Sequence, residues 1–117
     1  MNPTACSLVD VTRLVRELDA FADARDWHRH HSPKNLAMAL TGEVGELVEL
    51  FQWQSEAESY DTARHPATAR AVRDELADVL IYLVRLASVL EVDLDEAVRT
   101  KLVANARKYP APQVPRP

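Results

Sequence analysis

The chain has 117 residues, of which 47% are hydrophobic and 27% charged, which is the composition of one ordinary globular domain. Its formal net charge of −4 disfavours a nucleic-acid polymer as a partner, because a phosphate backbone requires a basic protein face. The single cysteine excludes an internal disulfide, and the sequence shows neither a run of 18 apolar residues nor a secretory leader pattern, so we expect a cytoplasmic protein without a membrane contact.

A shortage of turn residues favours an all-α fold. The sequence contains only two glycines, Gly42 and Gly45, whereas strands need turns that glycine usually supplies. Near the N-terminus the apolar residues recur at spacings of four and three, which predicts an amphipathic helix. We expect this first helix to begin at Ser7, as its N-cap, and to end at about Trp27.

A second helix follows a short loop at residues 28–32. Ser32 is a good N-cap and Pro33 a good first helical residue, because proline lacks the N–H that this position leaves unpaired. The apolar period then continues, so that the second helix is expected to end at about Gln54 or Glu56.

The third predicted helix is the most apolar one. The polar stretch at residues 55–66 has no period and predicts a loop, and Pro66 is placed to open the helix, which runs to about Leu90. After Asp78 it is apolar on nearly all sides, which indicates burial on more than one face. We therefore expect a homo-oligomer, either a dimer or a tetramer.

A fourth helix completes the domain. Asp93 followed by Glu96 resembles a capping box, and the helix is expected to end at about Lys108. Residues 1–109 are thus interpreted as one all-α domain, a four-helix bundle that assembles as an oligomer. Residues 110–117 hold four prolines and are expected to form a disordered tail.

Two acidic pairs lie inside the apolar stripes of the second and third helices. Glu43 and Glu46 are three residues apart, as are Glu75 and Asp78, so the members of each pair share a helix face. If these helices pack together, four carboxylates converge, and their mutual repulsion rivals the whole stability of a small domain. Such a cluster persists when cations fill it, and an all-oxygen ligand set selects Mg²⁺, Mn²⁺ or Ca²⁺.

Two other interpretations of the acids remain open at this level. Pairs of acids three residues apart are common on solvated helix faces, where each acid can pair with a neighbouring cation. The cations available for such pairing are Arg70, Arg73, Arg85 and Lys101. A di-iron bundle is disfavoured, because it requires a histidine three residues after a glutamate and none of the four histidines has that position.

The acids also carry a family resemblance. The stretches 42–47, Gly-Glu-Val-Gly-Glu-Leu, and 75–80, Glu-Leu-Ala-Asp-Val-Leu, resemble the MazG-like all-α NTP pyrophosphatase superfamily, whose signature is Glu-x-x-Glu followed by Glu-x-x-Asp. Here 28 residues separate the two motifs. Further stretches are similar to the dCTP pyrophosphatase branch of that superfamily: 25–27, His31, 33–36, 50–53, 78–83, Lys101, Asn105 and 109–110.

The resemblance implies a Mg²⁺-dependent enzyme, with Mn²⁺ as an alternative ion, that cleaves dCTP and modified dCTP to dCMP and pyrophosphate and so cleans the nucleotide pool. It also implies a tetramer in which each active site uses more than one subunit. Its implied metal ligands are Glu43, Glu46, Glu75 and Asp78, with Glu43 or Glu46 as the group that activates water. Its implied substrate contacts are Trp27, His31, Trp53 and Tyr82 at the nucleoside, Lys101, Asn105 and Lys108 at the phosphates, and Lys34, Asn35 and Tyr109 nearby.

These residue types are suited to binding a nucleotide, since Trp27 and Trp53 offer flat faces on which a base can stack. One departure concerns Leu18, which stands where many members of the branch carry a histidine. Base selectivity can therefore differ, and a pyrophosphohydrolase for dUTP or oxidised dNTPs is an alternative. The alternative outside enzymes is a helical interaction protein that keeps the fold without turnover.

Overall fold

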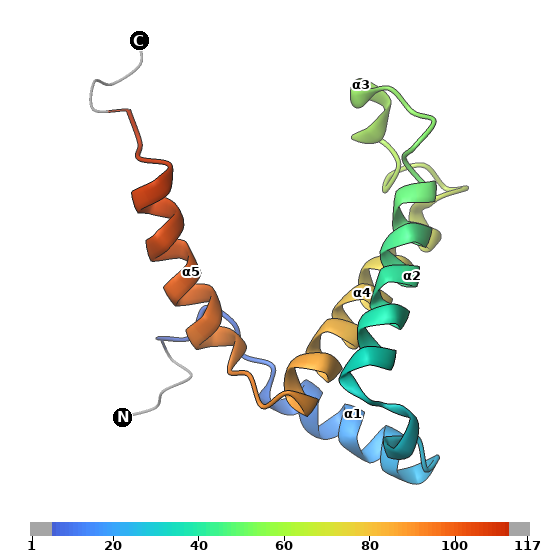
Figure 1. Ribbon diagram of the computed structural model, residues 1–117. Coiled ribbons are helices and arrows are strands. Elements are labelled where there is room, and N and C mark those ends of the chain that lie inside the picture. The colour runs from blue at the N-terminus through green and yellow to red at the C-terminus, as the bar shows by residue number, and fades with distance from the viewer. Residues whose placement is uncertain (1–5, 113–117) are drawn as a thin grey trace.

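The computed structural model describes residues 6–112, which contain helices and no strand, so the prediction of an all-α fold is confirmed for this part of the chain. Figure 1 shows the elements in chain order. They are α1 (Thr12–Ala24), the 3₁₀ turn η2 (His28–His30), α2 (Pro33–Glu49), the short α3 (Glu56–Ser59), α4 (Ala69–Val89) and α5 (Leu94–Lys108).

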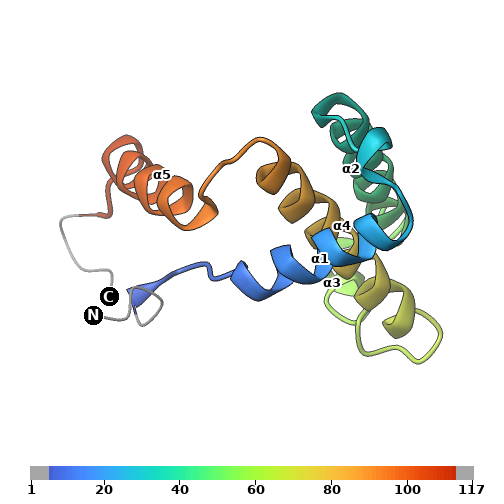
Figure 2. The same ribbon diagram turned by 90° about the horizontal axis from the view of Figure 1, so that it is seen from below.

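The core lies where α2 and α4 run side by side and α1 crosses one end of the pair (Figures 1 and 2). The fully enclosed side chains are Leu36 of α2 and Val84 of α4, and the other buried apolar residues are Ala22, Val72 and Ala87. α2 begins as predicted, because the Ser32 hydroxyl accepts a hydrogen bond from the Asn35 backbone N–H at 3.1 Å. This packing fixes the relative positions of the two helices that carry the acidic pairs.

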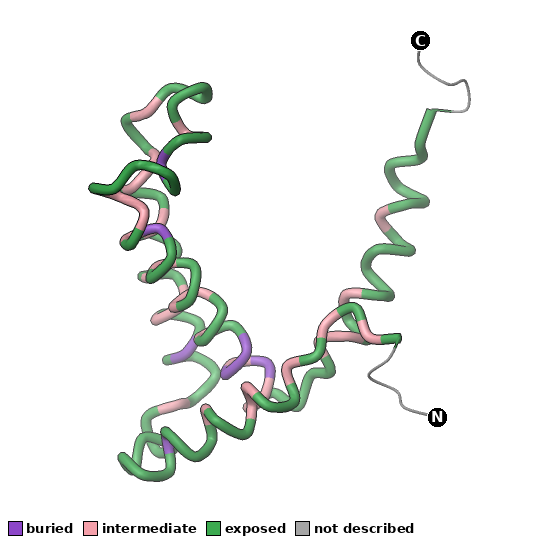
Figure 3. Tube along the Cα trace, turned by 180° about the vertical axis from the view of Figure 1, so that it is seen from behind, coloured by how far each residue is buried: buried purple, intermediate pink, exposed green. Residues whose placement is uncertain are grey.

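α5 stands apart from that unit. It extends away from α2 and α4 (Figure 1) and has no buried residue, as its exposed trace in Figure 3 shows. Its start is held by Asp95, whose Oδ1 accepts hydrogen bonds from the backbone N–H groups of Leu8 at 2.6 Å and Val9 at 3.0 Å. The predicted fourth helix is confirmed, with Asp93 as its cap, but one chain does not close a four-helix bundle.

The first helix is shorter than predicted at both ends. It begins at Thr12 rather than near Ser7, because Leu8 and Val9 use their N–H groups on Asp95 instead. It ends at Ala24 because Asp26 adopts a left-handed conformation, with φ of 54°, which breaks the helical path before Trp27.

The region between the acidic helices also differs from the prediction. Residues 55–66 were expected to be a loop, but a capping box starts α3 there, with Ser55 and Glu58 each bonding to the other's backbone N–H. The Ser-x-x-Glu spacing was therefore a readable signal. α2 ends at Glu49, short of the predicted end at about Gln54 or Glu56, and α4 begins at Ala69 rather than at Pro66.

None of the helices in residues 6–112 is long and apolar enough to span a membrane. Within the predicted disordered tail, residues 110–112 lack regular secondary structure, and residues 113–117 lie outside the described part of the chain.

Candidate active site

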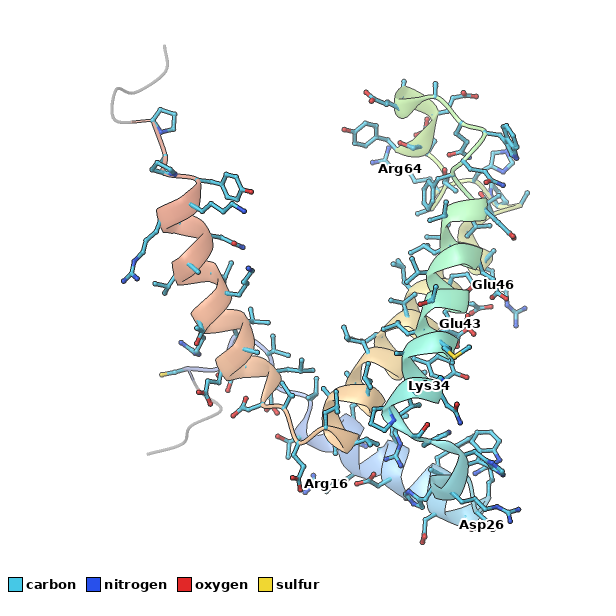
Figure 4. All side chains as sticks on the ribbon, in the orientation of Figure 1. Arg16, Asp26, Lys34, Glu43, Glu46 and Arg64 are labelled. Carbon is cyan, nitrogen blue, oxygen red and sulfur yellow. The ribbon has the colours of Figure 1, made fainter. Side chains whose placement is uncertain are left out.

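Three of the four predicted acids meet between α2 and α4. Glu43 of α2 and Glu75 and Asp78 of α4 each offer a carboxylate oxygen, and these oxygens lie within 4.8 Å of one another. All three side chains are half-buried. Glu46 follows Glu43 on α2, as labelled in Figure 4, and is exposed. Its carboxylate does not belong to this group of oxygens.

The cluster perturbs the protonation of its own members. Burial raises the pKa of Glu43, and the negative charges of Glu46 and Asp78 act in the same direction. Burial and the neighbouring carboxyl groups of Glu43 and Glu46 raise the pKa of Glu75 to about 7. Without a cation, the pKa of about 7 means that Glu75 keeps part of its proton at neutral pH, where an isolated carboxylic acid is ionised.

Basic side chains in the described part of the chain do not neutralise the acids. Among residues 6–112, no ion pair involves Glu43, Glu46, Glu75 or Asp78. Two of the cations that were available for pairing bind other acids, since Arg85 pairs with Asp19 and Arg70 lies 3.9 Å from Asp74. The interpretation of the acids as ordinary surface ion pairs is therefore not what the structure shows.

Two buried oxygens identify the cluster as a fit for a hard cation. Oε2 of Glu43 and Oε2 of Glu75 are inaccessible to solvent and have no hydrogen-bond partner in the described part of the chain. A buried carboxylate oxygen without a partner is costly, and a divalent cation removes that cost by direct coordination. Oxygen-only ligands on two rigid helices suit Mg²⁺ or Mn²⁺.

A cavity of about 330 Å³ opens beside the acids, between α1, α4 and the two residues that flank η2. It joins Asp78 of the cluster to three of the predicted nucleoside contacts, Trp27, His31 and Tyr82. The remaining lining residues are Glu17, Leu18, Phe21, Ala22, Ile81 and Arg85. The structure thus brings an aromatic pocket and a carboxylate cluster together in one place.

The aromatic side of the cavity is built by the turn that ends α1. The left-handed Asp26 reverses the chain so that the Trp27 backbone N–H donates to the Ala22 carbonyl at 2.9 Å. The Trp27 ring then packs edge-on against Phe21, with ring centroids 5.5 Å apart, and its centroid lies 6.0 Å from that of His31. The rings of Phe21 and Trp27 form an aromatic wall beside the His31 imidazole.

The comparisons with known proteins agree with this geometry. Residues 39–114 match the model of the MazG-like family. The chain belongs to the MazG-like family. It is 51% identical to dCTP pyrophosphatase 1 of Rattus norvegicus and 50% identical to that of Homo sapiens, over 89% and 90% of its own length. The aligned region covers 59% of the rat protein and 60% of the human one. A pyrophosphatase from Archaeoglobus fulgidus, known from a crystal structure, superposes with a TM-score of 0.79 at 43% identity, over 85% of this chain and 91% of that one.

Not every predicted substrate contact of this MazG-like chain reaches the cavity. Trp53 is 90% exposed and follows the end of α2, whereas Trp27 precedes its start. α2 has 17 residues and therefore spans about 25 Å, so the two rings cannot sandwich one base within a single chain. Asn35 uses its side-chain amide to donate to the His30 carbonyl at 3.0 Å, which ties η2 to α2. Lys34 is exposed near the start of α2, as labelled in Figure 4.

The predicted phosphate contacts all lie on the separate helix α5 or at its end. None of them lines the cavity beside the acids in the described chain. Most of these side chains are exposed, and Asn105 is half-buried. In the single chain, α5 lies away from α2 and α4, which carry the carboxylate cluster (Figure 1). The predicted phosphate contacts are Lys101, Asn105 and Lys108, and Tyr109, a further predicted substrate contact, follows directly at the end of α5.

Sequence reasoning did not identify Arg85 as part of the pocket, nor Asp19 as its ion-pair partner. Arg85 is 6% exposed, lines the cavity and bonds to two histidines as well as to Asp19. A signal was present, because Arg85 is the one charged residue in the apolar run 79–90 of the third predicted helix. A charge at such a position usually serves a buried partner.

Proposed function

We propose that the chain is a Mg²⁺-dependent nucleoside triphosphate pyrophosphatase that hydrolyses dCTP and modified dCTP to dCMP and pyrophosphate. The observation that carries the proposal is the carboxylate cluster of Glu43, Glu75 and Asp78 beside an aromatic cavity of about 330 Å³. Membership of the MazG-like family, and sequence identities of 51% and 50% to dCTP pyrophosphatase 1 of rat and human, support the reaction and the substrate class.

The four acids divide the chemical work in this proposal. Glu43, Glu75 and Asp78 would hold the ion, which supplies stabilisation of the negative charge that develops on the phosphates. Glu46 lies next to the cluster but is exposed, so that it can reach solvent. Glu46, or Glu43 once the substrate is bound, accepts the proton of the attacking water molecule.

The cavity holds the nucleoside. Trp27 gives a flat face for stacking, while His31 and Tyr82 offer polar groups to the base or sugar. Leu18 lines the same cavity, so the position where related enzymes carry a histidine contributes an apolar wall here. We propose that this wall tolerates a substituent on the pyrimidine ring, which fits a role in removing modified dCTP from the nucleotide pool.

The active enzyme is proposed to be a homo-oligomer, a dimer or a tetramer, in the cytoplasm. The single chain leaves large apolar side chains exposed on α2, α4 and α5, including Val48 at 51%, Leu76 at 53% and Leu102 at 53%. Exposed apolar surface of this extent indicates a protein partner. A second copy that covers it supplies Trp53 and the α5 residues Lys101, Asn105 and Lys108 to a neighbouring active site.

A pyrophosphate-release assay tests the function. Purified protein is incubated with Mg²⁺ and each of dCTP, 5-methyl-dCTP, dUTP, dTTP, dATP and dGTP, and the nucleotide products are separated. We expect a monophosphate and pyrophosphate from dCTP and 5-methyl-dCTP, with a higher kcat/KM than for the purine nucleotides. Equal kcat/KM for dATP and dCTP would contradict the pyrimidine pocket, and no release from any nucleotide would contradict the enzyme itself.

A further inference from the structure

A buried arginine connects the cavity wall to two histidines. Arg85 sits on α4 among apolar residues with 6% of its surface exposed, and its guanidinium forms an ion pair with Asp19 of α1. The Arg85 Nε donates to Nδ1 of His31 at 3.1 Å, and Nη2 lies 2.8 Å from Nδ1 of His28. One guanidinium therefore spans α1, η2 and the loop that precedes α2.

The chemistry of these contacts determines where the histidine protons are. A guanidinium stays protonated in proteins and can only donate hydrogen bonds, so each Nδ1 that it contacts must be an acceptor. A neutral imidazole with an accepting Nδ1 carries its proton on Nε2. At His28 the surroundings agree, because its Nε2 lies 3.7 Å from the Asp23 carboxylate. The same arrangement at His31 leaves Nε2–H as its free donor.

His31 can use that donor on a ligand. It lines the cavity with Trp27 and Tyr82, and no hydrogen bond within residues 6–112 involves its Nε2. Burial and the positive charge of Arg85 also lower the pKa of His31, which agrees with a neutral ring. A histidine without a fixed tautomer could offer either a donor or an acceptor on that edge.

We propose that Arg85 is a positioning residue that locks His31 in its Nε2–H form, so that the pocket presents a hydrogen-bond donor to an acceptor atom of the bound nucleoside. The identity of the ligand rests on the proposed function, whereas the lock itself belongs to the free protein. Acceptors of this kind are the carbonyl oxygens and unprotonated ring nitrogens of a base, or a sugar oxygen. A site built around one donor rejects an analogue that lacks the matching acceptor.

The lock can be observed directly in the wild-type protein without nucleotide. Long-range ¹H–¹⁵N correlation spectra of ¹⁵N-labelled protein at neutral pH distinguish the two imidazole tautomers, and loss of signals in His31→Gln assigns the resonance. We expect an unprotonated, hydrogen-bonded Nδ1 and a protonated Nε2 for His31. A protonated Nδ1, or a mixture of tautomers, would overturn the proposal even if the enzyme is active.

A matched pair of variants separates positioning from structural support. Arg85→Met keeps a long side chain but removes every donor, whereas Asp19→Asn keeps Arg85 and leaves an oxygen for it to bond. We expect Arg85→Met to mix the His31 tautomers and to raise KM about five-fold, the effect of one hydrogen bond, with kcat within two-fold of wild type. Asp19→Asn should keep both the tautomer and the KM. Equal effects in the two variants would overturn the proposal.

A rescue experiment provides the sharpest test. The glutamine introduced by His31→Gln carries an amide NH₂ that reaches about as far as Nε2 of histidine and is a donor without any lock. We therefore expect Arg85→Met combined with His31→Gln to lower the KM of Arg85→Met towards the wild-type value. Unchanged KM in the double variant would contradict the donor role. If Arg85→Met does not fold, which far-UV circular dichroism reports, the wild-type spectrum alone decides. Absence of turnover in wild type would refute the function and leave the tautomer result standing.

Discussion

The paired helices α2 and α4 differ from α5 in how their apolar residues are used. Leu36, Val72 and Val84 are buried along the packed pair α2 and α4, and the carboxylate cluster lies on that support. α5 exposes Leu102 at 53% and Val103 at 55%, and buries no residue. An amphipathic helix gains little stability until its apolar face is covered. The chain therefore has a self-supported half, formed by α1, α2 and α4, and an arm, α5, whose apolar face is left uncovered in the described chain. Under the proposed assembly, a second copy of the chain covers this arm.

The largest expected effect comes from the acids of the self-supported half. Glu75→Gln and Asp78→Asn should each lower kcat by at least about 100-fold at saturating Mg²⁺, because each removes a charged ligand oxygen from the cation. The loss of repulsion should leave the thermal stability of the metal-free protein equal or higher. Asp74→Asn is the control, since Asp74 is exposed and adjacent to Glu75 but outside the cluster. Near wild-type turnover in Glu75→Gln and Asp78→Asn would show that the chemistry lies elsewhere.

The next largest effect is expected from a substitution that separates α5 from the proposed second copy of the chain. Leu102→Asp places a charge on the exposed apolar face of α5, so we expect the assembly to dissociate to a mass near 13.1 kDa in light scattering. Activity should fall with the assembly, because the α5 residues can no longer reach a neighbouring site. Thr100→Asp is the control at another exposed position of the same helix. If the wild-type protein itself has a mass near 13.1 kDa at micromolar concentration, it is a monomer, and the proposal that a second copy covers α5 is wrong.

The raised pKa of Glu75 on α4 predicts how the stability of the metal-free protein depends on pH. The folded-state pKa of Glu75 is about 7, above its ordinary value of 4.5, so the folded protein binds this proton more tightly than the unfolded chain. The unfolding free energy of the metal-free protein should therefore decrease as the pH rises from about 4.5 to 7. Mg²⁺ competes with that proton, so its affinity should increase over the same range.

Thermal unfolding with a chelator and calorimetric titration with Mg²⁺ measure the two trends. Glu75→Gln should remove most of the stability trend, because glutamine does not titrate. A metal-free protein that becomes more stable between these pH values would contradict the raised pKa.

The smallest expected effect concerns the glycines of α2. A Cβ added at Gly42 or Gly45 would meet no atom within 4 Å in the single chain, so packing inside the subunit does not require glycine there. In the monomeric Leu102→Asp background, Gly45→Ala should raise the unfolding free energy by about 0.5–1 kcal/mol, the usual gain inside a helix. In the wild-type background, the same change should weaken assembly or activity if a second copy or the substrate approaches this face. Chemical denaturation and light scattering measure the two outcomes.

Local patterns in the sequence predicted the helices and much of the site, because those features depend on residues a few positions apart. Ser32 and Asp93 cap the helices that were expected to begin beside them. The spacing of Glu43 from Glu46 and of Glu75 from Asp78 set which acids could share a face. The Ser55–Glu58 capping box was equally local and was readable, although the prediction placed a loop there.

Tertiary structure decided the rest, because it depends on which helices touch. The packing of α2 on α4 left Glu46 outside the three-oxygen cluster, and a bond from Leu8 to Asp95 shortened α1 although neither residue suggests the other in sequence. Arg85 appeared in the sequence as one charge in an apolar helix, and only the fold placed Asp19, His28 and His31 around it. The sequence determines the chemistry of each side chain. The role of the buried Arg85 guanidinium depends on partners 54 to 66 residues away, because only folding of the chain brings them within hydrogen-bond distance.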